Sequence, residues 1–356
     1  MKDGLAGFAE AMAHCAAAGA AWPGAVAVSG GSDSVALMRL LKEWARREDV
    51  APPVVLTVDH GLQSGSRSIA RHVMKAAEEL ELRAHVLTWR GQKPRADIEA
   101  AARDARYGLL GRWCRKNKIR GLYLAHTRDD QAETFLLRLA RGSGVDGLAA
   151  MRPVAPFPLS DLAELRVVRP LLGVSRAALR TYLQGCGASW SEDPMNADPR
   201  FARVRLRAAW PALEQAGLSA ARIAGAAAHL ARARDALEAA TTQFLDEACH
   251  FDEGRIVVDG RRLATAPAEI GLRALAHILA RVSGTFYRPR FARLERLYEA
   301  IQGGHFKSAR TLQGCRIGPA PRSIAAFGAD SLVVTRERGR GKRSSAPDVA
   351  APGQIS

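Results

Sequence analysis

Cysteine is scarce in this chain, and its few cysteines are far apart. Only five occur among 356 residues, and none belongs to a C-x-x-C pair. Structural zinc sites and cysteine-ligated iron–sulfur clusters need closely spaced thiolates, so the pattern argues against both. It favours reduced thiols in a cytoplasmic protein. The cysteines are Cys15, Cys114, Cys186, Cys249 and Cys315.

Long apolar runs are also missing. No stretch of the sequence approaches the roughly 20 apolar residues that a membrane-spanning helix needs. The N-terminal segment carries Asp3 and Glu10 among alanine-rich turns, which predicts a helix rather than a signal peptide. Hydrophobic residues nevertheless make up 47% of the chain. We therefore expect a globular protein in the cytoplasm, with no membrane association.

Acidic residues are outnumbered. There are 52 Lys and Arg residues against 36 Asp and Glu residues, which gives a formal net charge of +16. Such an excess suits a polyanionic partner, and most of it is arginine, whose planar fork matches phosphate. A solvated basic surface in an arginine-biased sequence is the alternative that charge alone leaves open.

Strands and helices are predicted to alternate up to about residue 150, with no internal repeat. This alternation predicts an α/β fold with a doubly wound parallel sheet, in which ligands bind beyond the carboxyl ends of the strands. The expected strands are 25–28, 54–58, 84–88 and 121–125, and the expected helices are 33–46, 66–80, 97–117 and 129–140.

The rest of the chain suggests further domains. Residues 209–248 are alanine-rich and predicted to be helical, and residues 250–335 are predicted to form a smaller α+β or helical unit. The last residues are rich in Gly, Ser and Arg, which is typical of disorder. The predicted division is a catalytic domain at 1–208, a helical connector at 209–249, a C-terminal domain at 250–335 and a disordered basic tail at 336–356.

The sequence SGGSDS at residues 29–34 lies between a predicted strand and a predicted helix. Its glycines let the backbone turn and present N–H groups to a phosphate at the helix start. A carboxylate beside phosphates is repulsive unless a divalent cation bridges them, so Asp33 predicts Mg²⁺. The motif is neither a Walker A loop nor GxGxxG; a plain capped helix is the alternative. The candidate phosphate-binding residues are Ser29, Gly30, Gly31, Ser32, Asp33 and Ser34.

Polar residues follow two further predicted strands. Asp59 and His60 end the strand at 54–58, where they would help shape a nucleotide site or simply form a turn at Gly61. The segment HTRDDQAET at 126–134 follows the strand at 121–125. Because parallel strands share one carboxyl edge, we expect these clusters to converge with the 29–34 loop.

Within HTRDDQAET, Asp129 and Glu133 lie one helical turn apart and Asp130 lies three residues before Glu133. Like charges on one helix face are destabilising unless a cation neutralises them. A metal ion, the ammonium group of a substrate or nearby arginines could each do so. Thr127 and Asp130 also have the spacing of a capping box, so both capping and active-site chemistry remain open here.

Arginines gather in two other segments. Arg103 and Arg106 occupy neighbouring helical positions and could reach a phosphate, although a surface pair between Glu99 and Arg103 explains the spacing equally well. If residues 200–207 are helical, three of their arginines share a face that would suit RNA phosphates, or a solvated charged face. The candidate RNA- or phosphate-binding residues are Arg103, Arg106, Arg200, Arg203, Arg205 and Arg207.

In combination these motifs resemble the PP-loop ATP pyrophosphatases and, more narrowly, the tRNA(Ile)-lysidine synthase family. The likeness runs in chain order through SGGSDS, DHGL at 59–62, AARDARY at 101–107 and AHTRDDQAET at 125–134. It continues through RLARGSGVDGLAAM at 138–151, RPLL at 169–172 and WSEDPMN at 190–196. RTLQGC at 310–315 resembles the C-terminal tRNA-contacting region of the family more weakly.

The resemblance implies a Rossmann-like PP-loop ATPase domain and a ligase reaction. In this family ATP adenylates the carbon-2 oxygen of the wobble cytidine of tRNA(Ile) with a CAU anticodon, releasing pyrophosphate. The amine of L-lysine then displaces AMP to give lysidine, which changes codon reading from AUG to AUA. The implied cofactors are ATP and Mg²⁺, with L-lysine as co-substrate and tRNA(Ile) as partner. A homodimer is compatible with this reading.

The resemblance also implies roles for individual residues. The 29–34 loop, with Asp59 and His60, would bind ATP, and Asp33 would hold Mg²⁺. The acids of the 126–134 segment could bind lysine, assist Mg²⁺ or accept the proton of the attacking amine. Family members often differ at Thr127 (histidine), Met195 (serine) and Val204 (asparagine). The catalytic candidates are Asp33, His126, Asp129, Asp130 and Glu133.

Two alternatives compete with this reading. Another PP-loop tRNA-modifying enzyme, such as a tRNA thiolase, is disfavoured because such enzymes use paired cysteines or an iron–sulfur site. A non-catalytic RNA-binding relative is disfavoured because Asp33 and the DDQAET segment are intact.

Overall fold

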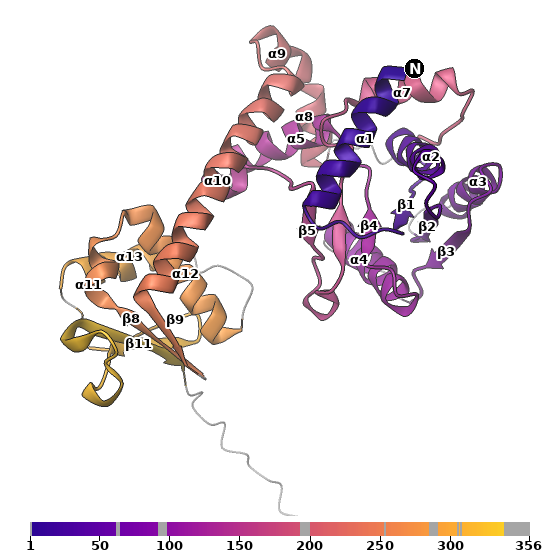
Figure 1. The fold of residues 1–356 in the computed structure, drawn as a ribbon. Coiled ribbons are helices and arrows are strands. Elements are labelled where there is room, and N and C mark those ends of the chain that lie inside the picture. Colours follow the sequence, from indigo (N-terminus) through magenta and orange to yellow (C-terminus); the bar gives the residue numbers. More distant parts are fainter. Residues whose placement is uncertain are drawn as a thin grey trace, which may run out of the picture. The chain divides into compact units, whose positions relative to one another are not determined.

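The computed structural model describes residues 2–61, 65–91, 98–192, 200–252, 254–284, 291–304, 306 and 308–337. The chain forms two compact units, Met1–Arg232 and Ala233–Ser356, which are considered separately (Figure 1). The long helix α10 (Ala220–Ala248) contributes to both. The domain limits expected from the sequence stay a prediction, and all of the predicted tail after Glu337 lies outside the described residues.

The first unit is built on a six-stranded sheet with the order β3-β2-β1-β4-β6-β5. All neighbouring strands are parallel except β5, which runs antiparallel to β6 at one edge. The predicted parallel α/β fold is confirmed, with this antiparallel edge as an addition. The strands are β1 (Ala25–Ala27), β2 (Val54–Asp59), β3 (Ala84–Thr88), β4 (Gly121–Tyr123), β5 (Val154–Pro156) and β6 (Arg166–Val168).

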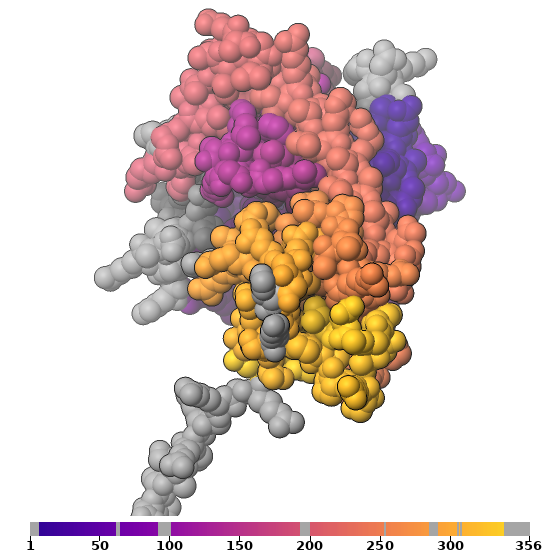
Figure 2. All heavy atoms as spheres, turned by 90° about the vertical axis from the view of Figure 1, so that its left-hand side faces the viewer, coloured from indigo at the N-terminus to yellow at the C-terminus, as the bar shows by residue number. Residues whose placement is uncertain are grey.

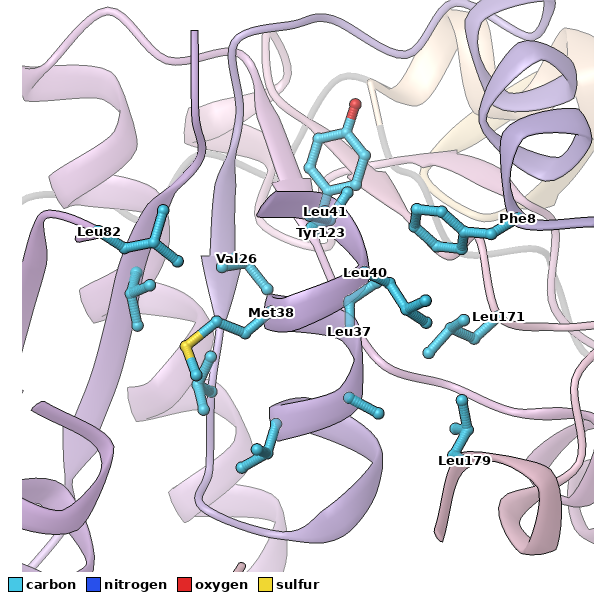
Figure 3. Close-up of a cluster of buried hydrophobic side chains, with 14 of the residues drawn as sticks. Phe8, Val26, Leu37, Met38, Leu40, Leu41, Leu82, Tyr123, Leu171 and Leu179 are labelled. Atoms are coloured by element: carbon cyan, nitrogen blue, oxygen red, sulfur yellow. The ribbon is translucent and has the colours of Figure 1, made fainter. Parts of the chain in front are cut away.

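Alternate residues of each strand point to opposite sides of this sheet. Because apolar side chains lie on both sides, helices cover both faces. On β1, Val26 packs with residues of α1, α2, α3 and α7, whereas Ala25 packs with residues of α4. Figure 3 shows the first of these cores, in which Leu37 and Met38 of α2 lie close to Val26. The middle of the sheet is therefore buried on both sides, whereas the edge strand β3 is partly exposed.

The helices of this unit lie close to their predicted positions. The region expected to be helical from residue 209 is interrupted: a short helix ends at Gln215, and Gly217, with φ +81°, follows it before α10 begins. The helices before α10 are α1 (Lys2–Ala17), α2 (Ser32–Arg47), α3 (Ser66–Glu78), α4 (Ile98–Lys116), α5 (Arg128–Leu139), α6 (Val145–Leu148), α7 (Arg176–Gly185), α8 (Ala202–Ala208) and α9 (Trp210–Gln215).

The second unit packs helices, among them the C-terminal end of α10, on a five-stranded antiparallel sheet of order β7-β8-β11-β10-β9. Its core joins Val258 and Ile317 of the sheet to Leu275 and Leu297 of the helices, and its surface is orange to yellow in Figure 2. The elements are β7 (Cys249–Asp252), β8 (Arg255–Asp259), α11 (Gly260–Thr265), α12 (Ala268–Ser283), α13 (Phe291–Gln302), β9 (Arg310–Leu312), β10 (Cys315–Pro319) and β11 (Ser331–Arg336).

Among the described residues of both units, no helix combines the length and the apolar character that crossing a membrane requires.

Candidate active site

The predicted phosphate loop connects β1 to α2, and its backbone is shaped for close approach. Gly30 has φ +90°, and a Cβ at this position would lie 2.6 Å from Cγ2 of Ile69. The Ser34 hydroxyl donates to the Gly31 carbonyl at 2.9 Å and accepts from the Ser29 N–H at 3.1 Å. Gly31 is the N-cap of α2 and supplies no side-chain cap. The first turn of α2 therefore presents N–H groups that suit an anion.

The acidic segment begins α5, beyond the carboxyl end of β4. Thr127 is its N-cap: Thr127 Oγ1 accepts from the Asp130 N–H at 3.3 Å, and Asp130 Oδ2 accepts from the Thr127 N–H at 2.8 Å. The capping box is therefore present. It uses only one oxygen of Asp130 and leaves the other, Oδ1, to face a different partner. Capping and a role in the site are compatible at this residue.

A single arginine that the sequence did not single out joins the phosphate loop to α5. Arg176 begins α7, and 22% of its side chain is exposed. Its Nε donates to Asp33 Oδ2 at 3.2 Å, and its Nη2 donates to Asp130 Oδ1 at 2.9 Å. Its Nη1 donates to Glu133 Oε1 at 3.4 Å, and its backbone N–H donates to Asp129 Oδ2 at 2.9 Å. These four acids are named the acidic cluster below.

Glu133 is the most deeply buried acid of the cluster, with 3% of its side chain exposed. Arg207 holds it from α8, with Nε donating to Oε1 at 2.7 Å and Nη2 donating to Oε2 at 3.2 Å. Arg203 Nε lies 4.0 Å from Oε2. The sequence allowed a metal ion, a substrate ammonium group or arginines to neutralise these acids. In the structure, arginines of α7 and α8 form ion pairs with them.

Burial and the charge of Arg176 have opposite effects on the pKa values of Asp33 and Asp130. Burial raises the pKa of Asp33 above its ordinary value, although Arg176 partly opposes this. Burial would also raise the pKa of Asp130, but Arg176 and the Thr127 hydrogen bonds outweigh it, so that pKa lies below its ordinary value. Burial alone would lower the pKa of Arg176, yet the four acids raise it. Arg176 therefore favours the charged forms of Asp33 and Asp130, and the acids favour the charged form of the guanidinium.

His126 lies beside the acidic cluster in a basic environment. The Nε–H of Arg169 donates to His126 Nδ1 at 3.3 Å. Because a guanidinium can only donate, the ring carries its proton on Nε2. Burial, followed by the charge of Arg169, lowers the pKa of His126 to about 3. The residue is thus a neutral imidazole that presents an N–H donor, which fits orientation of a substrate better than proton removal.

Asp59 ends β2, next to β1 in the sheet, and contacts its own loop. Its Oδ1 accepts from the Gly61 N–H at 3.1 Å and from the Ser66 hydroxyl, and Arg67 lies 3.8 Å from its Oδ2. His60 follows it, and the next residue of the DHGL motif after Gly61 lies outside the described residues. The carboxyl ends of β2, β1 and β4 are adjacent, as predicted, but the contacts described here join only the loops after β1 and β4.

The predicted basic residues divide into two groups. Arg103 and Arg106 are exposed on α4 and flank the ring of Tyr107, with guanidinium carbons 5.1 Å and 5.9 Å from its centre. Near α8, Arg203 and Arg207 turn toward Glu133. The two others there are exposed: Arg200 precedes α8, and Arg205 donates to the Arg200 carbonyl at 2.8 Å.

The WSEDPMN motif also reaches the phosphate loop. The Ser191 N–H donates to the Gly30 carbonyl at 2.8 Å, which ties the chain after α7 to the loop after β1. The rest of this motif after Glu192, including Met195, lies outside the described residues. Arg169 and Arg176 are the site residues that sequence reasoning missed. In the sequence, Arg169 is the first residue of the RPLL motif at 169–172 and Arg176 follows that motif. The residue types of this motif do not indicate a particular chemistry.

The residues present fit a magnesium ion only together with phosphate. Within the described ranges, no group of three or more His, Cys, Asp or Glu side chains could hold a metal ion. Asp33 lies at the start of α2 with 21% of its side chain exposed. Mg²⁺ commonly uses one or two carboxylates together with substrate phosphates and water. One carboxylate at the edge of a phosphate loop is consistent with that arrangement.

The fold and this loop define the class of protein. A family model described as PP-loop domain matches residues 11–213. A curated tRNA(Ile)-lysidine synthase from Ruegeria pomeroyi is 44% identical over 82% of this chain and 68% of the relative. Another from Methylobacterium nodulans is 42% identical over 83% of this chain and 85% of the relative. The chain belongs to the tRNA(Ile)-lysidine synthase family.

A solved structure, the U34-tRNA thiolase NcsA from Methanococcus maripaludis, is much more distant. It is 17% identical and has a TM-score of 0.46 over 60% of this chain and 71% of that chain. The thiolase alternative gains no support from a likeness of this size.

Proposed function

We propose that this chain ligates L-lysine to carbon 2 of the wobble cytidine in tRNA(Ile) with a CAU anticodon, in the cytoplasm. ATP would be converted to AMP and pyrophosphate. The observation that supports this most is the contact of Asp33, at the phosphate loop, with the acids of α5 through Arg176. A loop that suits the phosphates of a nucleotide would then lie beside acids that suit a cationic amine.

In the first step the carbon-2 oxygen of the cytosine attacks the α-phosphate of ATP, and pyrophosphate leaves. The 29–34 loop and the start of α2 would hold the phosphates, and Asp33 would hold Mg²⁺, which would neutralise phosphate charge. Asp59 and His60 would border the nucleotide. His126 would donate its Nε2–H to the substrate and so orient it.

In the second step the neutral amine of lysine attacks carbon 2, and AMP leaves with the electron pair of the carbon–oxygen bond. Lysine enters as an ammonium ion, which a cluster of carboxylates would attract, and one of them would accept the proton whose loss gives the neutral, attacking amine. We keep Asp129, Asp130 and Glu133 as the candidates for this work. The exposed arginines of α4 and those at 200–207 would contact tRNA phosphates. Assembly as a homodimer is part of the proposal, to be tested by light scattering.

The deciding experiment is incorporation of labelled lysine into tRNA(Ile) with a CAU anticodon, in the presence of ATP and Mg²⁺. Transcripts of tRNA(Met), which share this anticodon, are the control. Selective incorporation into tRNA(Ile) is expected. Release of pyrophosphate without incorporation would retain the adenylation step and reject lysine as nucleophile. Absence of ATP turnover with either tRNA would favour the non-catalytic RNA-binding alternative.

A further inference from the structure

Arg176 connects elements that are far apart in the chain. Its partner Asp33 belongs to α2 and lies 143 residues away, whereas Asp130 and Glu133 belong to α5. No other contact described here joins the carboxylate of Asp33 to an acid of α5. Among the contacts described here, this side chain is therefore the link between the carboxylate of Asp33 and the acids of α5.

The geometry uses the whole guanidinium. Each of the three nitrogens has a different carboxylate partner, at 3.2 Å for Nε, 3.4 Å for Nη1 and 2.9 Å for Nη2. A guanidinium holds its donors in a rigid plane, whereas a lysine ammonium is a point charge on a flexible stem. Lysine at this position would supply the charge without fixing three acceptors in one plane.

The backbone that carries this side chain is itself held in place. Ser175 caps α7 by accepting from the Ala178 N–H at 3.2 Å, and the Val174 carbonyl accepts from the Arg128 N–H of α5 at 2.9 Å. Leu179 and Leu183, on the same helix, are buried in the core against α2. Arg176 thus begins a helix that is anchored to both elements it joins.

We propose that Arg176 is a positioning residue: its guanidinium sets the placement of Asp33 relative to Asp130 and Glu133, and with it the alignment of the nucleotide with the attacking amine. This inference rests on the proposed function, because it assigns these acids to that reaction. The competing role is simple neutralisation of four negative charges. The two roles differ in one respect, since only the first requires the planar fork.

The test compares Arg176→Lys, which keeps the charge, with Arg176→Gln, which removes it. Arg180→Gln is the matched control, because Arg180 lies one turn further along α7 in an exposed pair with Glu192 at 3.4 Å. Each variant is assayed for thermal melting, tRNA(Ile) affinity, and kcat and KM for lysine with ATP, Mg²⁺ and tRNA. Rates are referred to folded protein, determined by circular dichroism.

We expect Arg176→Lys to fold and to bind tRNA as the parent does, yet to lose about 100-fold in kcat, the usual effect of misplacing reacting groups by about 1 Å. Arg176→Gln should lose at least as much. Arg180→Gln should match the parent in all assays.

Full activity of Arg176→Lys would overturn positioning and leave charge neutralisation. A loss in Arg176→Lys that merely follows its loss of folded protein would overturn it too. Failure of the parent protein to form lysidine is a separate result that rejects the proposed function. In that case the same variants are compared by their affinity for ATP with Mg²⁺, where an unchanged affinity in both would also reject the inference.

Discussion

At the scale of single residues, the two oxygens of Asp33 have different surroundings. Oδ2 accepts from Arg176 Nε at 3.2 Å, and within the described part of the chain Oδ1 accepts from the Ser32 hydroxyl at 3.1 Å. A hydroxyl can rotate to another acceptor, whereas a guanidinium held by three acids is less free to move. Oδ1 is therefore the better placed of the two oxygens to meet a cation at the phosphate loop.

Asp33→Asn should remove the charge with little change in shape. We expect AMP formation to fall about 100-fold or more, because a bound metal commonly contributes several kcal/mol to the transition state. Affinity for tRNA should be unchanged, since Asp33 is an acid inside the site. The measurement is AMP release by thin-layer chromatography together with filter binding of tRNA. Parental activity in Asp33→Asn would rule out the Mg²⁺ role.

His126 provides a prediction about pH. Its pKa is lowered to about 3 by burial and Arg169, whereas an ordinary histidine titrates near 6.5. Between these values the unfolded chain binds more protons than the folded protein, so this residue makes stability rise with pH and fall on acidification. His126→Gln keeps an N–H donor but cannot titrate.

Unfolding by urea at several pH values from 7 to 4 checks this. The variant should lose less free energy of unfolding on acidification than the parent. Acids away from His126, such as Asp252, whose pKa Arg255 lowers, act in both proteins and cancel in the difference. Parallel curves for the two proteins would show that His126 titrates normally in the fold.

At the scale of elements, the turn from β1 to α2 depends on Gly30. Alanine there would meet two penalties: a left-handed backbone, which costs an L-residue about 1–2 kcal/mol, and a Cβ 2.6 Å from the branched side chain of Ile69. Overpacking adds about 1–3 kcal/mol. Because Gly30 lies against Ile69 of α3, we expect the added methyl group in Gly30→Ala to distort the 29–34 loop and weaken ATP binding.

Gly91→Ala separates the two penalties, since Gly91 has a similar φ of +95° but no atom lies within 4 Å of the place that a Cβ would occupy. Chemical denaturation should show a smaller loss for Gly91→Ala than for Gly30→Ala, by the cost of the contact with Ile69. ATP affinity should fall only in Gly30→Ala. Equal losses of stability would mean that α3 yields to the added methyl group.

At the scale of the whole molecule, the arginines that produce the net charge of +16 differ in how well they can contact a polyanion. Arg207 is engaged by Glu133, whereas Arg205 on the same short helix is exposed. An arginine held by a buried carboxylate releases few counterions when RNA binds, and one at the surface releases more. The arginine segment at 200–207 therefore serves the acidic cluster as well as the RNA surface.

This difference predicts distinct variants of α8. Arg205→Gln should lower the slope of log affinity for tRNA(Ile) against log salt by about one, with normal turnover once tRNA is saturating. Arg207→Gln should instead reduce stability, because it leaves Glu133 buried with less compensation, and it should change the salt slope less. Filter binding at 50–200 mM salt measures both. An unchanged slope for Arg205→Gln would remove this arginine from the RNA interface.

The sequence by itself determined the features whose causes are local. Apolar runs at 25–28 and 54–58, the turn at Gly30 and the capping pair of Thr127 and Asp130 each involve residues a few positions apart. Backbone sterics, helix capping and strand burial act at that range, so the α/β sheet and the loops at its carboxyl edge could be predicted. The family motifs add the expected chemistry to these positions.

Only the tertiary structure decided what neutralises the acids. Arg176 lies 143 residues from Asp33, and Arg207 lies 74 residues from Glu133. An arginine in the first turn of a helix has no local signal that separates a buried bridge from a solvated side chain. The packing of α7 against α2, and of α8 against α5, brings these charges together. Burial then makes their pairing necessary, because an unpaired charge away from water is too costly.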